Sequence, residues 1–276
     1  MLRQYLTCFP EGKRKALTFS YDDGRIADKQ LVDIFNRYGL RATFHLNGQL
    51  LYSENKPQNP IWRTSIFPDE VKELFCGHEI AAHTATHPMI DRTPLEMTAQ
   101  EIIEDRKILE QLVQIPVRGL SYPFGVYNNQ IKDLLPALGI DYSRIVGDSE
   151  SFNLPTDWFT WKPTCHHNHK LLELGEKFKA IKNSLHLHLM YVWGHSYEFA
   201  CDNNWDLIED FAKQISSEDD IWYATNYEIY AYMEASKRLQ YAASGDFVYN
   251  PSAIDIWIEV DAKVFRVPAA LQVGLN

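Results

Sequence analysis

The chain has 276 residues, of which 45% are hydrophobic and 23% charged, a composition typical of one large α/β domain with a buried core. Acidic residues outnumber basic ones by 37 to 27, and the net charge of −10 argues against duplex nucleic acid and anionic membranes as main partners. No segment approaches the roughly 18 consecutive apolar residues of a membrane helix. The first residues also lack the basic and apolar segments of a signal peptide. We therefore expect a cytoplasmic protein, or a secreted one if a leader has been removed.

Seven β-prone runs alternate with amphipathic segments along most of the chain. In chain order, strands are predicted at 16–21, 42–46, 78–82, 117–122, 142–146, 187–193 and 221–225. Helices are predicted in the segment that ends at Gly39, at 68–75, from Leu95, from Asn128, at 170–181, at 205–215 and from the last strand to about residue 239. The first helix would bury the face that carries Leu31, Ile34, Phe35 and Tyr38.

Two of these helices contain proline at an informative position. Thr93, Pro94, Leu95 and Glu96 have the pattern of a capping box with proline at the first helical position, so we expect Thr93 to cap this helix. Pro136 lies inside the helix that begins at Asn128, where proline removes a hydrogen bond and weakens the prediction.

Seven strand–helix units in sequence predict a parallel sheet or a barrel, one unit short of the usual eight. After them, the segment 247–267 alternates, with Ile254, Ile256, Ile258 and Val260 on one face. We expect a single domain over 1–276, with a core at about 16–239 and a small β appendage in the tail at 240–276.

The cysteines lie far apart and match no disulfide framework, so we expect free thiols. They are Cys8, Cys76, Cys165 and Cys201. Cys165 precedes His166 and His167, a pattern that could indicate a metal site, although a loop with a buried thiol and ordinary histidines is the favoured interpretation.

Four polar groups follow predicted strands. They are Asp22-Asp23-Gly24, the segment from His83 to His87, Tyr122-Pro123-Phe124-Gly125, and Gly194-His195. Each alone could be an ordinary turn or a buried histidine. Together they fall at the carboxyl ends of strands, where sequential α/β folds build their sites.

The residue types in these groups are compatible with metal-dependent hydrolysis. One carboxylate and two imidazoles can bind a divalent ion such as Zn²⁺ at roughly 2.0–2.2 Å and leave open positions for water and a substrate oxygen. A second carboxylate could take the proton of the water, and a further histidine could protonate a leaving amine.

The segments 18–24 (TFSYDDG) and 77–88 (GHEIAAHTATHP) closely resemble the first and second motifs of the polysaccharide deacetylases, the NodB-type carbohydrate esterases of family 4. The resemblance extends over about 16–239. The family fold is a distorted barrel with fewer than eight complete βα units. The resemblance therefore implies a distorted (β/α)7 barrel, which agrees with the seven units in the chain.

Roles follow from the resemblance by position. Asp22 matches the catalytic base, and Asp23, His83 and His87 match the metal ligands. Thr84 matches the Ser or Thr after the first ligand histidine. The turn of Tyr122, Pro123, Phe124 and Gly125 resembles the third motif, which assigns an oxyanion-binding N–H to Phe124.

The later motifs depart from the family pattern. The arginine that normally precedes the third-motif proline and orients the base is replaced by Ser121 and Tyr122, with Arg118 upstream. Asp157-Trp158 could be the fourth motif, and Trp161 is a competing aromatic wall for a sugar. His195 is preferred as the general acid over His188, because His188 lies at the start of its strand.

The resemblance implies hydrolysis of an acetamide or acetyl ester with one divalent ion as cofactor, Zn²⁺ in the first place and Co²⁺, Mn²⁺ or Ni²⁺ as alternatives. The expected partner is an acetylated sugar or a small amide. Two alternatives stay open, a hydrolase of another C–N bond such as that of a ureide, and an inactive relative that binds carbohydrate. The sequence gives no oligomeric state.

Overall fold

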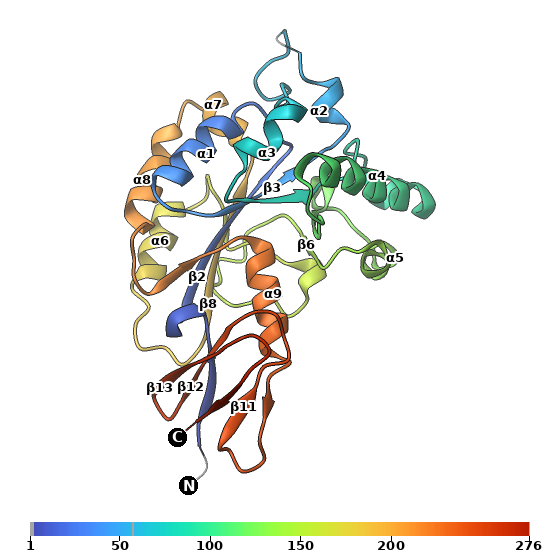
Figure 1. Ribbon diagram of the computed structural model, residues 1–276. Helices are drawn as coiled ribbons and strands as arrows, with labels where there is room; N and C mark the ends of the chain where they lie inside the picture. The colour runs from blue at the N-terminus through green and yellow to red at the C-terminus, as the bar shows by residue number, and fades with distance from the viewer. Residues whose placement is uncertain (1–2, 57, 276) are drawn as a thin grey trace.

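The computed structural model of the protein describes residues 3–56 and 58–275. A curved, open sheet of parallel strands forms the centre, in the order β6-β5-β4-β3-β2-β8-β7, with β9 paired to β2 (Figure 1). The strands are β2 (Lys15–Asp22), β3 (Ala42–Leu46), β4 (Glu79–Ala82), β5 (Gly119–Ser121), β6 (Tyr142–Arg144), β7 (Cys165–His166), β8 (His188–Gly194) and β9 (Ile221–Tyr223). The sheet is a half-barrel and confirms the predicted α/β class.

Strand β2 is the axis of the sheet, and all eight of its residues are buried. Strand β8 pairs with it over residues 15–21, whereas β9 pairs over 15–17 and β3 over 19–22. Because a strand has two edges, β9 and β3 must share the edge opposite β8. Its Leu17, Phe19 and Tyr21 pack into the main core under the helices, whereas Thr18, Ser20 and Asp22 are buried on the opposite face of the strand.

Eight of the nine described helices bury side chains against the outer side of the sheet, and the last one packs in a second core between the sheet and the β-rich tail (Figure 1). The helices are α1 (Asp28–Arg37), α2 (Leu50–Ser53), α3 (Val71–Leu74), α4 (Leu95–Val113), α5 (Asn129–Leu134), α6 (Leu171–Lys179), α7 (Ser196–Cys201), α8 (Trp205–Ile215) and α9 (Asn226–Ser236). The main core lies between sheet and helices, where Leu31, Ile34 and Phe35 of α1 are buried as predicted. No described helix is long and apolar enough to span a membrane.

All seven predicted strands are confirmed, with ends that differ by up to two residues. The eighth strand, β7, was not predicted, because two residues are too short to give a periodic signal. The expected cap of α4 is wrong: Pro94 is the N-cap residue, and the Thr93 hydroxyl donates to the carbonyl of Met89 at 2.9 Å. Pro136 ends α5 early, since the chain continues from Leu135 as a 3₁₀ turn.

The β-rich tail forms two small antiparallel sheets at the end of the molecule that also holds the N-terminus (Figure 1). One contains β1 (Tyr5–Cys8), β12 (Ile256–Val260) and β13 (Lys263–Val267), and the other β10 (Gln240–Tyr241), β11 (Phe247–Tyr249) and β14 (Gln272–Gly274). Ile256, Ile258 and Val260 are buried, as their alternation predicts. The pairing of β1 with β12 was not predicted.

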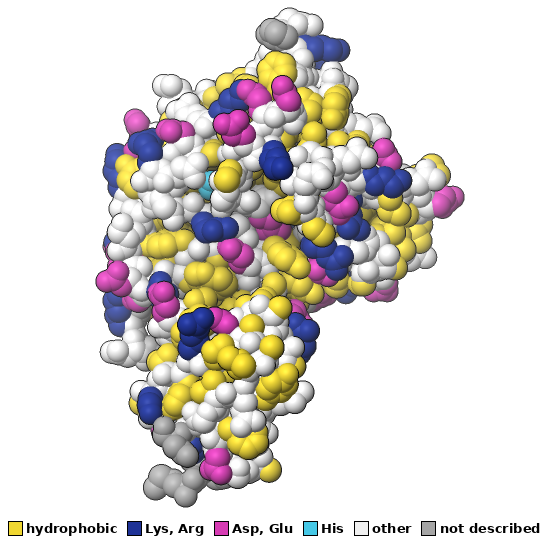
Figure 2. All heavy atoms as spheres, in the orientation of Figure 1, with side chains coloured by type: hydrophobic (Ala, Val, Ile, Leu, Met, Phe, Trp, Pro, Cys, Tyr) yellow, Lys and Arg dark blue, Asp and Glu magenta, His cyan; other side chains and the backbone are white. Residues whose placement is uncertain are grey.

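Charged side chains are mixed on the surface. On the face drawn in Figure 2, acidic and basic groups are interspersed, and hydrophobic side chains gather over the appendage. All four cysteines are free thiols, as expected, with Cys8 and Cys165 buried.

Candidate active site

The four polar groups meet in one cleft at the carboxyl end of the sheet. The cleft has a volume of about 700 Å³. Of the predicted residues, it is lined by Asp22, Asp23, His83, His87, Tyr122, Phe124 and His195. The cleft is also lined by Trp193 and by three side chains that were not predicted to contribute, namely Arg25, Trp62 and Tyr197.

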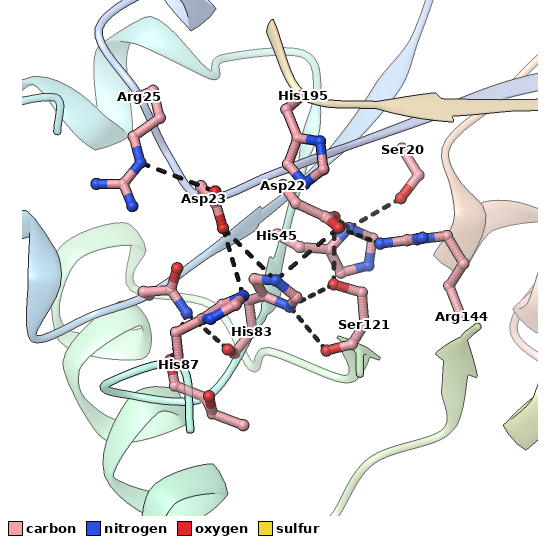
Figure 3. Close-up of polar contacts among 12 residues, drawn as sticks. Ser20, Asp22, Asp23, Arg25, His45, His83, His87, Ser121, Arg144 and His195 are labelled. Atoms are coloured by element: carbon pink, nitrogen blue, oxygen red, sulfur yellow. Dashed lines mark hydrogen bonds and ion pairs between the residues drawn. The ribbon is translucent and has the colours of Figure 1, made fainter. Parts of the chain in front are cut away.

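Asp23, His83 and His87 bring three potential ligand atoms together (Figure 3). The Oδ1 atom of Asp23 lies 3.6 Å from Nε2 of His83 and 3.8 Å from Nε2 of His87. This oxygen is buried and has no hydrogen-bond partner in the described structure. A buried carboxylate oxygen without a partner is costly, and a divalent cation would satisfy it, so these residues fit a metal site.

The contact of His83 with Ser121 leaves the ring nitrogen that faces Asp23 free to bind a metal. Its Nδ1 lies 2.8 Å from the backbone carbonyl of Ser121. A carbonyl can only accept, so Nδ1 carries the proton and the lone pair on Nε2 faces Asp23. The main chain of His83 is fixed by Asp105 of α4, whose Oδ2 accepts its N–H at 2.8 Å and whose Oδ1 accepts the N–H of Gly48 at 2.6 Å.

Backbone strain is concentrated at this site. Asp23 (φ 80°), Thr84 (φ 64°), His87 (φ 60°) and Phe124 (φ 57°) all adopt the left-handed region. Positive φ is unusual for any residue with a side chain and most unusual for a β-branched one such as Thr84. Strain of this kind persists only where the surroundings enforce it, and it clusters at functional sites.

Asp22 occupies a different environment from its neighbour. It is almost fully buried, forms an ion pair with Arg144, and accepts a hydrogen bond from the Ser121 hydroxyl at 3.2 Å (Figure 3). Burial raises the pKa of this carboxyl, but Arg144 and the rings of His83 and His45 outweigh burial, so the pKa lies well below its usual range. Asp22 is therefore an ionised carboxylate.

Arg144 is the arginine that contacts Asp22, in place of the arginine that the third motif lacks. It is the register partner of Ser121 across the β5–β6 pair, so it reaches Asp22 from the next strand rather than from the third motif. Its guanidinium also lies over the Trp193 ring at 4.7 Å. Arg118, which is upstream in sequence, instead makes two hydrogen bonds with Asp141. An arginine at the carboxyl end of a predicted strand was the available signal.

His195 reaches toward the two aspartates from the carboxyl end of β8 (Figure 3). Its Nδ1 lies 3.3 Å from Glu198 Oε1. Burial lowers the pKa of His195, but the hydrogen bond with Glu198 and the charges of Asp23 and Asp22 outweigh burial and raise it above the ordinary value. His188 lies at the opposite end of β8, beside the hydroxyl of Ser184.

Several aromatic residues do not lie where they were expected. Trp161 is buried, and its ring packs against Tyr142 and Tyr191 in the second core. Trp158 donates from Nε1 to Glu234 rather than facing the cleft. Neither of them is among the residues that line the cleft, because their contacts hold them in the second core.

The third-motif turn lies beside the metal ligands. Pro123 is buried, and the Tyr122 hydroxyl turns away from the cleft to donate to the carbonyl of Phe159 at 2.9 Å. Phe124 is half exposed, and its ring contacts His87 at a centroid distance of 4.5 Å. Gly125 has a φ of 70°, and a Cβ there would collide with Val146, so this turn requires glycine.

Comparisons with known proteins point to the family that the two motifs resemble. The family model described as polysaccharide deacetylase matches residues 10–143. A chitooligosaccharide deacetylase from Bradyrhizobium sp. (strain ANU 289) is 26% identical over 120 residues, which are 42% of this chain and 49% of that protein. The match thus spans about half the length of the curated relative.

Two solved structures share the fold. The Xyl-CE4 domain of a multidomain xylanase from the hindgut metagenome of Trinervitermes trinervoides has a TM-score of 0.53 at 18% identity, over 81% of this chain and 92% of that one. The Puue allantoinase has a TM-score of 0.61 at 13% identity, over 81% and 91%. At these identities the similarity shows the architecture alone.

Proposed function

This chain belongs to the polysaccharide deacetylase family, and we propose that it is a metal-dependent hydrolase that removes an acetyl group from an N-acetylated or O-acetylated carbohydrate. The observation that carries the proposal is that two adjacent carboxylates have different partners. Asp23 faces two histidines with an unsatisfied oxygen, whereas Asp22 is held by Arg144 and Ser121. One set suits a metal ligand and the other a base.

Asp23, His83 and His87 would hold the divalent ion, with Zn²⁺ as the first candidate. A divalent ion bound there supplies Lewis-acid polarisation of the acetyl oxygen and lowers the pKa of a nearby water. The backbone N–H of Phe124, in the turn beside His87, is the proposed second donor to the oxyanion.

Asp22 would accept the proton of the attacking water. It is ionised, and the ion pair with Arg144 and the hydrogen bond from Ser121 restrict its rotation. His195 would donate a proton to the leaving nitrogen or oxygen. Glu198 at its Nδ1 fixes the ring so that Nε2 is left for the substrate, and its raised pKa favours the protonated form that an acid requires.

The test is acetate release from N-acetylated chitooligosaccharides and acetylated xylan, with Asp22→Asn and Asp23→Asn as variants. Each should lose most turnover, and Asp23→Asn should also lose metal. Asp133→Asn is the matched control, because this aspartate is exposed on α5 outside the cleft. Hydrolysis of a ureide but of no acetylated sugar would show that the bond type is wrong, and tight sugar binding without turnover would support an inactive relative.

A further inference from the structure

A second group of metal-ligating side chains lies outside the site described above. His166, His167 and Glu198 converge where β7 ends and α7 begins. Nε2 of His166 is 3.0 Å from Glu198 Oε2, and Nε2 of His167 is 3.3 Å from the same oxygen. Two imidazoles and one carboxylate are the same donor set as Asp23, His83 and His87.

Of these three residues, His167 is the one whose side-chain nitrogens lack hydrogen bonds in the described structure. It is fully buried between the rings of Tyr21 and Phe199, and neither of its nitrogens has a hydrogen-bond partner in the described structure. Burial lowers its pKa to about 2, so the ring is neutral and presents one N–H and one lone pair. Leaving both unsatisfied in the interior is costly, and a bound cation would satisfy the lone pair.

Gly194 leaves the space that the His167 ring occupies. A Cβ on Gly194 would lie 2.0 Å from His167 Nδ1, so only glycine permits the approach. The ligand spacing is also suitable. Ligands bound to one ion at about 2.1 Å lie about 3.0–3.4 Å apart in octahedral or tetrahedral geometry, which matches the two separations measured to Glu198 Oε2.

We propose that His166, His167 and Glu198 form a second divalent-metal site, of the Zn²⁺ class, that fills after the first. The order follows from the tautomer of His166. Its Nδ1 accepts the N–H of Asn168 at 3.2 Å, so without an ion Nε2 carries the proton and donates to Glu198. An ion must displace that proton and weaken the bond to Asn168, whereas the proton of His83 already lies on Nδ1, toward Ser121.

The second ion would act on the first site through Glu198. Its Oε1 accepts from Nδ1 of His195, and its Oε2 faces the second site. A cation on Oε2 would withdraw negative charge from the partner of His195. This consequence rests on the proposed function: excess metal should inhibit deacetylation, because an ion bound to Oε2 would draw Glu198 away from Nδ1 of His195 and disturb the orientation of that ring.

Metal stoichiometry tests the site without any activity. Purified protein is dialysed against increasing Zn²⁺, and bound metal is measured by mass spectrometry. Wild type should bind two ions in steps at least tenfold apart in concentration, and His166→Gln and the double variant His83→Ala with His87→Ala should bind one each. His186→Gln, an exposed histidine at the far end of β8, is the control and should bind two. Circular dichroism and thermal melts would show that each variant folds.

The outcomes separate the two proposals. Saturation of wild type at one ion, or two ions in His166→Gln, would overturn the second site while leaving the first untouched. If His166→Gln loses one of two ions but wild type releases no acetate, the second site stands and the proposed function fails. With Co²⁺ in place of Zn²⁺, the second equivalent should give its own absorption bands in wild type and none in His166→Gln.

Discussion

Arg144 and Asp22, the last residues of β6 and β2, form a buried ion pair across the carboxyl end of the sheet. Strands β5, β4 and β3 lie between them in the sheet. The pair can form because the sheet is curved, so that its carboxyl end closes around the cleft. Arg144 thus reaches the proposed base from β6, which is four strands away from β2 in the sheet. Its position depends on the curvature of the whole half-barrel.

Arg144→Met should lower the deacetylation rate at neutral pH by about 10²-fold or more, because the proposed base loses its orientation. Loss of the cation raises the pKa of Asp22, so the acidic limb of the kcat/KM profile should move to higher pH. The measurement is the pH–rate profile with an acetylated oligosaccharide. Removing one partner of a buried pair costs about 3–5 kcal/mol of stability, so unfolding is followed in parallel.

Two further variants control this prediction. Arg144→Lys keeps a cation near Asp22 and should leave the acidic limb closer to that of wild type. Arg118→Met removes an arginine that pairs with Asp141 outside the cleft, so the profile should not move. A wild-type profile in Arg144→Met would contradict the role of Arg144.

Glu198→Gln should shift the alkaline limb of the profile to lower pH. The hydrogen bond from Nδ1 of His195 to Glu198 raises the pKa of His195, so its loss lowers that pKa. The acid form is then depleted at lower pH, and rates fall most on the alkaline side. The profile is measured at one equivalent of metal, so that the second site stays empty. An unchanged alkaline limb would mean that another group is the acid.

Local patterns predicted most of the sheet but less of its site. Strands such as β2 and β3 are continuous buried runs with a strong signal, and their carboxyl ends carry Asp22 and Asp23. The role of Arg144 depends on the β5–β6 register with Ser121, and the pairing of β1 with β12 joins segments about 250 residues apart. Contacts of this kind arise from tertiary structure, which no local period reports.

The position of Asp105 could have been recognised from the helical periodicity of the sequence. It lies on the buried face of α4 with Ile102, Leu109 and Val113, where a carboxylate must have a structural partner. Its partners are the N–H groups of His83 and Gly48. A polar residue within an apolar stripe therefore marked a support of the metal site.

Asp105→Ala should destabilise the fold by about 1–3 kcal/mol, because it leaves the N–H of Gly48 unpaired, whereas the N–H of His83 keeps its bond to the carbonyl of Leu46 at 3.0 Å. It should also weaken metal binding at the first site, because the main chain of His83 loses its bond to α4. Chemical denaturation and metal titration measure the two effects. Glu104→Ala, on the exposed side of the same helix, should change stability by no more than about 0.5 kcal/mol. Equal metal affinity in Asp105→Ala and wild type would exclude the positioning role.

Trp62 and Trp161 should respond differently to truncation, because one is in the cleft and the other in the core. Trp62 is half exposed and lines the cleft, so its ring can stack on a sugar. Trp62→Ala should raise KM about three- to tenfold, since aromatic contacts contribute about 0.5–1.5 kcal/mol, with little change in kcat or stability. Trp161→Ala should leave KM unchanged but cost about 3–5 kcal/mol of stability.

Steady-state kinetics and thermal unfolding of both variants would check this contrast. If Trp161→Ala raised KM while Trp62→Ala did not, the sugar would bind against the second core, and the cleft would be the wrong place for the substrate. A rise in KM for long oligosaccharides alone in Trp62→Ala would place that ring beyond the reacting sugar, because a monosaccharide at the metal site would not reach it. A rise for both lengths would place Trp62 beside the acetylated sugar itself.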